Sequence, residues 1–501
     1  MRNRRFHWML PFGAAVLLFA SCQKKIKKDE IVAIVGDRVI TTDEFIRRAE
    51  YTIRPPYCKM DAYLQKKIVF NSLVAEKLFA FEAGDDNPLA KNADFQNQIR
   101  GRTEQLMRQT LYYKEAMNKV KPDTTDIKKR YKVAGREYNI AFFSMGRNAA
   151  EYALTQQMRG GEQNAFDDLY RQVAGIGPVP ERKVSWQGKE DPVIHQAMFG
   201  EPLKKNQVLG PIKVDENQYL MIKVLGWIDR PVITDTAMRQ RWEDVSDELK
   251  REEANAVWDR YVGKIMKGKS LVFEENAFRK MAKFLMPMYF KTDSEQKEMI
   301  NSIYWNNENP NFSPDTSGLD RKTFMKMPFF TLDGKSYAVE DYLRMLDTHP
   351  LVFRKKKMNK GEFMEQLKYA IADMIRDRFV TEKAYDKGID KSPYVKMYAD
   401  MWRDSFLSFY QRSRILKDRG ATGDPQKDYM KHINLFLNPV ADSLFKKYSP
   451  EIKVNIQNFD KIQLTRIDLV VRHEGVPYPE AVPSFPLLTT RNRMDYGSLM
   501  K

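Results

Sequence analysis

The same order of elements occurs twice along the chain. Residues 31–40 place mostly β-branched apolar side chains on both sides of a Gly-Asp pair, which predicts two strands joined by a tight turn. Thr41 or Asp43 then supplies the cap of a helix. Residues 330–339 repeat the strand pair around an Asp-Gly turn, and acidic residues again follow. This repetition predicts two copies of one helical module.

Helical periodicity continues in both copies. The predicted helices are 68–83 and 90–119 in the first copy, and 364–385 and 394–416 in the second. Each copy ends with a further helix and a short apolar strand, namely 239–267 with 270–273, and 438–448 with 452–456. We expect each closing strand to pair with the opening hairpin of its own copy, which would complete a helical module.

A different pattern lies between the opening and closing elements of the first copy. Residues 137–143 are typical of a strand, and 148–159 and 165–169 are typical of helices. Residues 207–227 form two apolar runs separated by the polar turn 215–218. The predicted fold class is therefore α+β and mostly helical. Two helical modules are expected, the first carrying an inserted domain with a small antiparallel sheet plus helices.

The strand pair at 207–227 resembles the last two strands of the parvulin-type peptidyl-prolyl isomerase domain, where a Gly-Pro strand and a short turn precede Gly-Tyr-His-Ile-Ile-Lys-Val. Residues 184–188 and 197–199 resemble the turn and the Ala-x-Phe motif of that family. The opening stretches 35–45 and 72–79 resemble the helical chaperone module of the SurA/PrsA exported foldases. That module is split in sequence by parvulin domains. The chain therefore resembles a SurA/PrsA-type foldase.

The resemblance implies two SurA-like helical modules and a division of the whole chain. The expected parts are a lipoprotein signal peptide 1–21, a tether 22–30, the opening part of module 1 at 31–134, a parvulin-like domain 135–230, the closing helix and strand of module 1 at 231–290, a linker 291–325, module 2 at 326–420, its closing helix and strand at 421–465, and a C-terminal tail 466–501. We expect the tail, which is rich in proline after residue 477, to be irregular and to reach out to a contact.

Three positions depart from the parvulin pattern. Asn139 and Leu220 stand where the family has histidines, and Gly175 stands near the place of its cysteine or aspartate. The barrier to isomerisation is about 18–20 kcal/mol of amide resonance. An enzyme lowers it by gripping the proline ring and favouring the twisted amide. These degenerate catalytic positions leave isomerase activity uncertain, and a binding role is the stronger expectation.

The residues expected to form an apolar substrate-binding pocket by this resemblance are Trp186, Met198, Phe199 and Met221. The alternative interpretation is that all four belong to the core of the small domain. His195 precedes this motif and is interpreted as a solvated helix position rather than as a displaced active-site histidine.

The first residues have the pattern of an export signal. Arg2, Arg4 and Arg5 precede the apolar stretch 8–20, which is too short to span a bilayer comfortably. The stretch ends in a small residue before Cys22, which resembles a lipobox and implies acylation of Cys22. We expect a lipid-anchored protein of the cell envelope that faces the periplasm, on the outer rather than the inner membrane. An ordinary secretory signal is the alternative.

Charge and composition limit the class of partner. The formal net charge is +17, but export argues against nucleic acid as a partner and favours lipid head groups or acidic polypeptide segments. The 5 histidines are scattered and no Gly-rich phosphate loop occurs, so we expect no metal and no other cofactor. With 26 methionines and 29 phenylalanines, the chain is rich in side chains that adapt to varied apolar partners.

These observations predict a folding chaperone that binds unfolded exported or outer-membrane proteins. Two alternatives stay open. One is an active peptidyl-prolyl cis-trans isomerase, and the other is a structural accessory subunit of the outer-membrane protein assembly machinery.

Overall fold

The computed structural model describes residues 30–59, 63–158, 165–174, 177–188, 190–215, 217–290, 321–355, 358–423, 427–464, 477–479 and 481–500. The described chain is mostly helical and contains small sheets whose strand pairs are antiparallel except for one, which confirms the α+β class. The expected signal peptide, Cys22, and most of the linker 291–325 lie outside the described residues. Within the described ranges, no helix combines the length and apolar character needed to cross a membrane.

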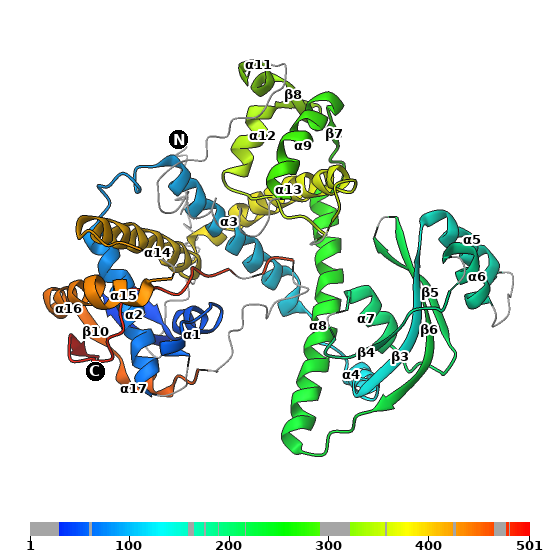
Figure 1. Ribbon diagram of the computed structural model, residues 1–501, viewed down its shortest axis with the longest axis horizontal. Helices are drawn as coiled ribbons and strands as arrows, with labels where there is room; N and C mark the ends of the chain where they lie inside the picture. Colours follow the sequence, from blue (N-terminus) through cyan, green and yellow to red (C-terminus); the bar gives the residue numbers. More distant parts are fainter. Residues whose placement is uncertain are drawn as a thin grey trace, which may run out of the picture.

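Both ends of the chain build one unit, which we call the end module. Its sheet has the order β11-β10-β1-β2, with strands β1 (Ile31–Val35), β2 (Arg38–Thr41), β10 (Ile452–Val454) and β11 (Ser498–Leu499). The helices around it are α1 (Thr42–Glu50), α2 (Tyr63–Ala83), α14 (Pro393–Asp418), α15 (Tyr429–His432), α16 (Asn438–Lys447) and α17 (Ile456–Lys461). Helix α2 is buried along most of its length because these elements surround it (Figure 1).

The middle of the chain forms a second unit, the middle module. Its sheet has the order β7-β8-β9, with β7 (Leu271–Phe273), β8 (Pro328–Leu332) and β9 (Lys335–Ala338). The helices that pack with it are α9 (Glu275–Tyr289), α11 (Arg321–Lys326), α12 (Val339–Leu346) and the first turns of α13 (Phe363–Asp386). Short 3₁₀ helices occur at Pro56–Cys58, Met117–Lys119, Ile389–Lys391 and Ser449–Glu451, and a π-helix at Ile433–Leu437.

Each of the two closing strands, β7 and β10, pairs with the hairpin that the sequence analysis had assigned to the other strand. Strand β1 pairs with β10, so that Ala33 lies opposite Val454, whereas β7 pairs with β8, so that Val272 lies opposite Thr331. The expected pairing of 270–273 with the first hairpin and of 452–456 with the second is therefore wrong. Burial gives the physical reason, since Ile452 and Val454 complete the apolar core under β1, while β7 completes the core that contains Phe330.

The small domain was expected to contain a small antiparallel sheet plus helices, and this is what it contains. The sheet has the order β4-β3-β6-β5, with β3 (Arg136–Met145), β4 (Glu181–Ser185), β5 (Val208–Asp215) and β6 (Gln218–Asp229). One core holds side chains of α5 (Arg147–Met158) and α6 (Ala165–Ala174) against the sheet. A second core holds α4 (Thr124–Tyr131), α7 (Pro192–Phe199) and the long helix α8 (Asp235–Met266).

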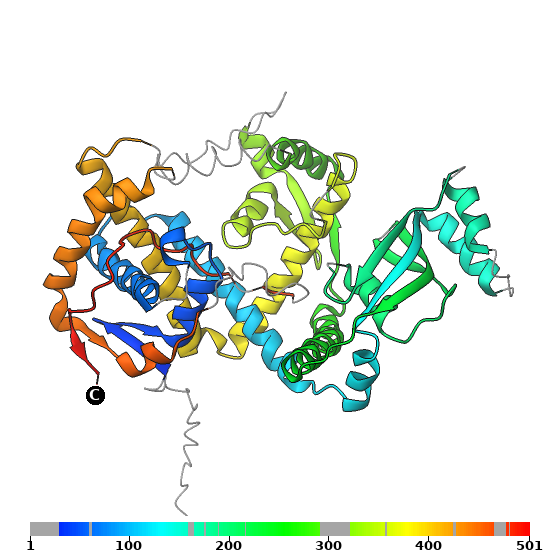
Figure 2. The ribbon, with the colours of Figure 1, turned by 60° about the horizontal axis from the view of Figure 1, so that its bottom comes forward.

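A shared core joins the modules. It contains apolar side chains of α3 (Ala93–Glu115), α8, α13 and α14, together with Tyr478 from near the end of the chain. The end module lies at one extremity of the molecule and the small domain at the other, with α8 beside the small domain (Figures 1 and 2). Helix α3 runs from the end module to the shared core. The shared core holds the two modules side by side.

Candidate functional site

The residues expected to form one apolar pocket in the small domain do not form one. Trp186, Met198 and Phe199 share a core, where the Trp186 and Phe199 rings meet edge to face at 5.5 Å. Met221 belongs to the other core of the same domain. Successive residues of a strand point to opposite faces of a sheet, so Met221 points away from its neighbour Leu220 and from these three residues. All four side chains are buried core residues.

The degenerate catalytic positions also lie apart. Asn139 is half-buried on β3 opposite Gly226, whereas Leu220 is buried on β6 opposite Ser144. Along β3, five positions separate Asn139 from Ser144, the residue opposite Leu220, which corresponds to roughly 17 Å of strand. Gly175 and Cys22 lie outside the described residues.

His195 is buried, in contrast to the solvated position that the sequence predicted. Its imidazole Nε2 lies 3.1 Å from the carbonyl oxygen of Trp186, and burial lowers the pKa of His195. One ring nitrogen of His195 and the carboxylates of Glu248 and Glu252 come within 4.8 Å of one another, a grouping that could hold a metal ion. Arg130 already pairs with Glu252 at 2.7 Å, and Arg251 pairs with Glu248. Because these arginines neutralise both carboxylates, the cluster is balanced without a cation.

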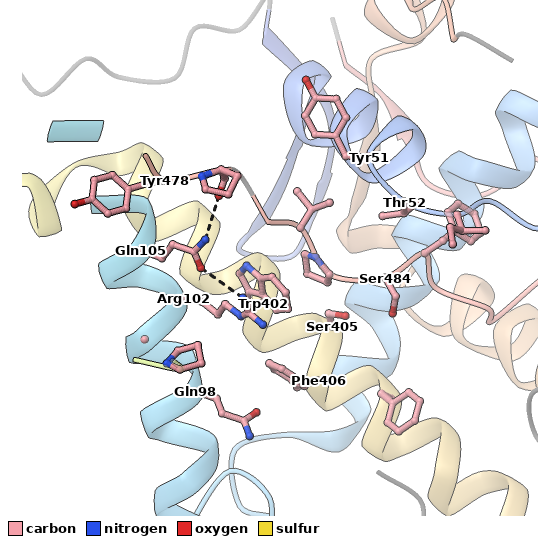
Figure 3. Close-up of a pocket in the computed structure, with 18 of the residues that line it drawn as sticks. Tyr51, Thr52, Gln98, Arg102, Gln105, Trp402, Ser405, Phe406, Tyr478 and Ser484 are labelled. Atoms are coloured by element: carbon pink, nitrogen blue, oxygen red, sulfur yellow. Dashed lines mark hydrogen bonds between the residues drawn. The ribbon is translucent and has the colours of Figure 1, made fainter. Parts of the chain in front are cut away.

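A large cleft lies between the end module and the middle module. Its volume is about 1620 Å³. The walls come from α3, α13 and α14, from the loops 51–59 and 346–354, and from the end of the chain (Figure 3). Two apolar side chains on the lining are largely exposed, Ile53 at 74% and Val352 at 64%. Large exposed apolar side chains that face a concave surface indicate a binding site.

A buried ion pair lies at one side of the cleft. Arg48 of α1 donates from both terminal nitrogens to the carboxylate of Glu76 of α2, at 2.6 and 2.7 Å. Both side chains are almost fully buried. Lys77 extends the network to Glu44 and Asp404, at 3.0 and 3.2 Å. A buried bidentate pair of this kind fixes the orientation of its arginine, and Arg48 donates one further hydrogen bond to the carbonyl oxygen of Ser484, which lines the cleft.

Asp377 of α13 is the centre of a second polar group. Its carboxylate lies 3.1 Å from the Nε2 of His349, accepts from Arg376 at 2.8 Å, and accepts from the hydroxyl of Tyr478 at 2.9 Å. Burial alone would raise the pKa of Asp377, but His349, Arg376 and Arg108 outweigh it, so the pKa lies below its usual value. Asp377 is therefore an anion that ties α13, the loop before it and the end of the chain together.

The end of the chain crosses this cleft as a strap, defined here as residues 477–479 and 481–486. It has no helix or strand and takes an extended path between the modules (Figure 1). Gln105 of the cleft lining and three side chains beside the cleft donate hydrogen bonds to its carbonyl oxygens. The bonds run from Gln109 to Tyr478 at 3.0 Å, from Gln105 to Pro479 at 3.0 Å, from Tyr398 to Ala481, and from Arg48 to Ser484 at 3.0 Å. Gln105 and Tyr478 lie together at the α3 wall (Figure 3).

The sequence did not single out these cleft residues. Glu76 and Lys77 interrupt the apolar run of the second predicted helix, and a charged pair in the middle of such a run is a signal that could have marked a buried network. For the tail, the sequence predicted an irregular segment with a contact. The described part is irregular except for β11, and residues 477–479 and 482–488 line the cleft.

Comparison with known proteins gives no family for this chain. No protein-family model matches it, and no curated protein matches it either. Its function is therefore argued from its own residues.

Proposed function

We propose that this protein is a folding chaperone of the cell envelope, which binds extended segments of unfolded exported or outer-membrane proteins in the cleft between its modules. The observation that carries the proposal is the cleft itself, with a volume of about 1620 Å³ and the exposed apolar side chains Ile53 and Val352. Small-molecule pockets typically occupy roughly 300–1,000 Å³, so the cleft has the size for a polypeptide segment.

The chemistry of the lining supports the same proposal. An unfolded segment offers apolar side chains together with main-chain carbonyl and amide groups, and both need partners when they leave water. The cleft offers apolar contact at Ile53 and Val352, and Gln105 on its α3 wall is a donor to main-chain carbonyl oxygen, as its bond to Pro479 illustrates. Such a lining suits many sequences, because main-chain groups are common to all polypeptides.

In this proposal the SurA/PrsA resemblance accounts for the two helical modules, and the parvulin-like domain is a third arm of doubtful isomerase activity. Its candidate pocket residues Trp186, Met198 and Phe199 are occupied by contacts with one another and with His195. Acylation of Cys22 would anchor the chain in a membrane, with the outer membrane favoured. The formal charge of +17 supports a position near anionic head groups or acidic clients.

The test is suppression of aggregation of an unfolded outer-membrane protein by the chain from Lys24 onward. We expect Ile53→Asp and Val352→Asp to weaken suppression several-fold, because a charge replaces an apolar contact. Ile233→Asp is the matched control, since Ile233 is 88% exposed and does not line the cleft.

Equal suppression by wild type and both cleft variants would refute the assignment to this cleft. A purification that yields one stoichiometric partner and no suppression would instead favour the assembly-subunit alternative. Catalysis of prolyl isomerisation well above the uncatalysed rate would favour the isomerase.

A further inference from the structure

The strap has the composition of a ligand rather than of a strand. Its sequence, including residue 480, reads Pro-Tyr-Pro-Glu-Ala-Val-Pro-Ser-Phe-Pro. Proline has no main-chain N–H, so a segment of this kind cannot pair as an inner strand of a sheet. Its carbonyl oxygens remain available as acceptors. Grooves that take proline-rich segments use this property, since such segments are already extended and lose little entropy on binding.

Side chains at and beside the cleft wall supply donors that match those carbonyl oxygens. Gln105 and Gln109 are one helical turn apart on α3 and reach two adjacent residues of the strap, at 3.0 Å each. Tyr398 of α14 and Arg48 of α1 reach further carbonyls along the same path. These donors contact the main chain of the strap and not its side chains, so the recognition does not depend on the identity of most strap residues.

Two aromatic side chains of the strap are buried: Phe485 in the core of the end module, and Tyr478, which anchors the other end of the strap, in the shared core. The ring of Tyr478 is 4% exposed and meets Trp258 edge to face at 6.0 Å. Its hydroxyl donates to Asp377 at 2.9 Å, and the guanidinium of Arg108 lies 5.6 Å from the ring centroid. An aromatic ring with a satisfied polar end, set in a pocket between three helices, has the properties of an anchor residue at an interface.

The part of the strap up to Ser484 can leave while the end module stays folded, because Phe485 is buried in the core of that module and the chain after it is held separately. Arg491 pairs with Asp442 at 2.6 Å. The ring of Tyr496 stacks on Phe445 at 4.4 Å, and strand β11 pairs with β10. These contacts lie outside the cleft and do not involve the strap.

We propose that the strap is an intramolecular ligand of the cleft, and that the cleft takes segments of the same chemistry from other polypeptides: extended, proline-containing, and with an aromatic side chain in the place of Tyr478. The proposal rests on the proposed function and names the ligand class of the same site. Strap and client compete for the same donors. A tethered segment competes at an effective concentration in the millimolar range, so only clients that engage several donors displace it.

The test is binding of a labelled peptide, with the strap sequence 477–486, to the full-length chain in mild detergent. We expect Tyr478→Ala to bind this peptide at least about 10-fold more tightly than wild type, because the strap of the variant has lost its anchor. Tyr398→Phe keeps its ring and loses one donor to the strap, so a smaller effect is expected. Arg491→Ala is the matched control, since it loosens the tail outside the cleft and leaves peptide affinity at the wild-type level.

A peptide in which serine replaces the tyrosine should bind Tyr478→Ala at least about 10-fold less tightly than the strap peptide. Thermal melting of each variant establishes that it is folded. If Tyr478→Ala does not fold, competition by unlabelled strap peptide against an unfolded client on the wild-type chain decides the question. Equal affinity of wild type and Tyr478→Ala for the strap peptide, or absence of competition, overturns the proposal.

Aggregation suppression measured on the same samples separates the two proposals. If the chain suppresses aggregation and added strap peptide does not change this, the proposed chaperone function is supported and the proposal that the strap is a ligand of the cleft is overturned. If Tyr478→Ala changes peptide binding but the samples suppress no aggregation, the strap proposal is supported and the chaperone proposal is overturned.

Discussion

At the scale of single residues, the molecule depends on charges placed where water is excluded. Arg48 and Glu76 are almost fully buried and compensate each other, and Arg48 also donates to the strap. Asp377 pairs with the guanidinium groups of Arg376 and Arg108 at the opposite wall of the cleft. Removing one member of a buried pair costs far more than the pair contributes, because the other charge is left without a partner.

Glu76→Gln should therefore lower the free energy of unfolding by about 3–5 kcal/mol. The measurement is denaturant unfolding at neutral pH. Glu82→Gln is the matched control, because Glu82 lies on the same helix in a partly exposed pair with Lys447. An exposed pair contributes about 0–1 kcal/mol, so the control should change little. Similar losses in the two variants would contradict a special role for the buried network.

His195 predicts a pH dependence. Burial lowers the pKa of His195 in the folded state, so the unfolded state takes up a proton first as pH falls below about 6.5. The contribution of neutral His195 to the free energy of unfolding is fully present above that pH and is lost progressively below it. We expect the small domain to lose stability between pH 7 and pH 5, and His195→Gln to lose less over the same range. Thermal melts across this range test it, and parallel losses in both proteins would exclude His195 as the cause.

At the scale of elements, the exchange of closing strands is the main feature of the fold. Strands β10 and β7 are both short, apolar and preceded by a helix, so either could close either hairpin. The register places Ala33 opposite Val454 in one sheet and Val272 opposite Thr331 in the other. The chain ends are consequently held in one module, and the middle of the chain forms the other.

A cross-linking experiment tests this exchange. Cysteines placed at Ala33 and Val454 should form a disulfide on mild oxidation, because residues directly opposite in an antiparallel pair have Cα atoms about 4.5–5.5 Å apart. Cysteines at Ala33 and Val272 should not. Non-reducing electrophoresis distinguishes the two, with the native Cys58 replaced by serine in both. Cross-linking of the Ala33 and Val272 pair alone would contradict the observed exchange and support the pairing that the sequence predicted.

At the scale of the whole molecule, the cleft depends on how closely the modules approach. Gly101 of α3 faces the main chain at Thr348, and a Cβ at this glycine would lie 2.2 Å from that carbonyl oxygen. Both residues line the cleft. Glycine is therefore required at this point of contact between α3 and the loop of the middle module.

Gly101→Ala should separate α3 from this loop and lower the free energy of unfolding by about 1–3 kcal/mol, as overpacking does. Gly263→Ala is the control, since nothing lies within 4 Å of the position of its Cβ. A helical glycine in open space is about 1 kcal/mol less favourable than alanine, so this control should be stabilising. Unfolding experiments and small-angle scattering measure both effects. Equal stability of the two variants would show that the approach is not restrictive.

The sequence alone determined the local elements. The first hairpin, its Thr41 cap, and the helices at 364–385 and 394–416 occur where periodicity and capping predicted them. These elements depend on hydrogen bonds between residues a few positions apart, so the information lies within each segment. The α+β class and the β5–β6 hairpin of the small domain followed for the same reason.

Only the tertiary structure decided which elements meet. The pairing of β1 with β10, the burial of Trp186 and Phe199 in a core, and the place of Tyr478 beside Asp377 join residues that are distant in sequence. The sequence of an apolar residue does not tell whether it lines a pocket or fills a core. The sequence of an apolar strand does not tell which hairpin the strand pairs with. The cleft, which is built from such distant contacts, could therefore be recognised only in the folded chain.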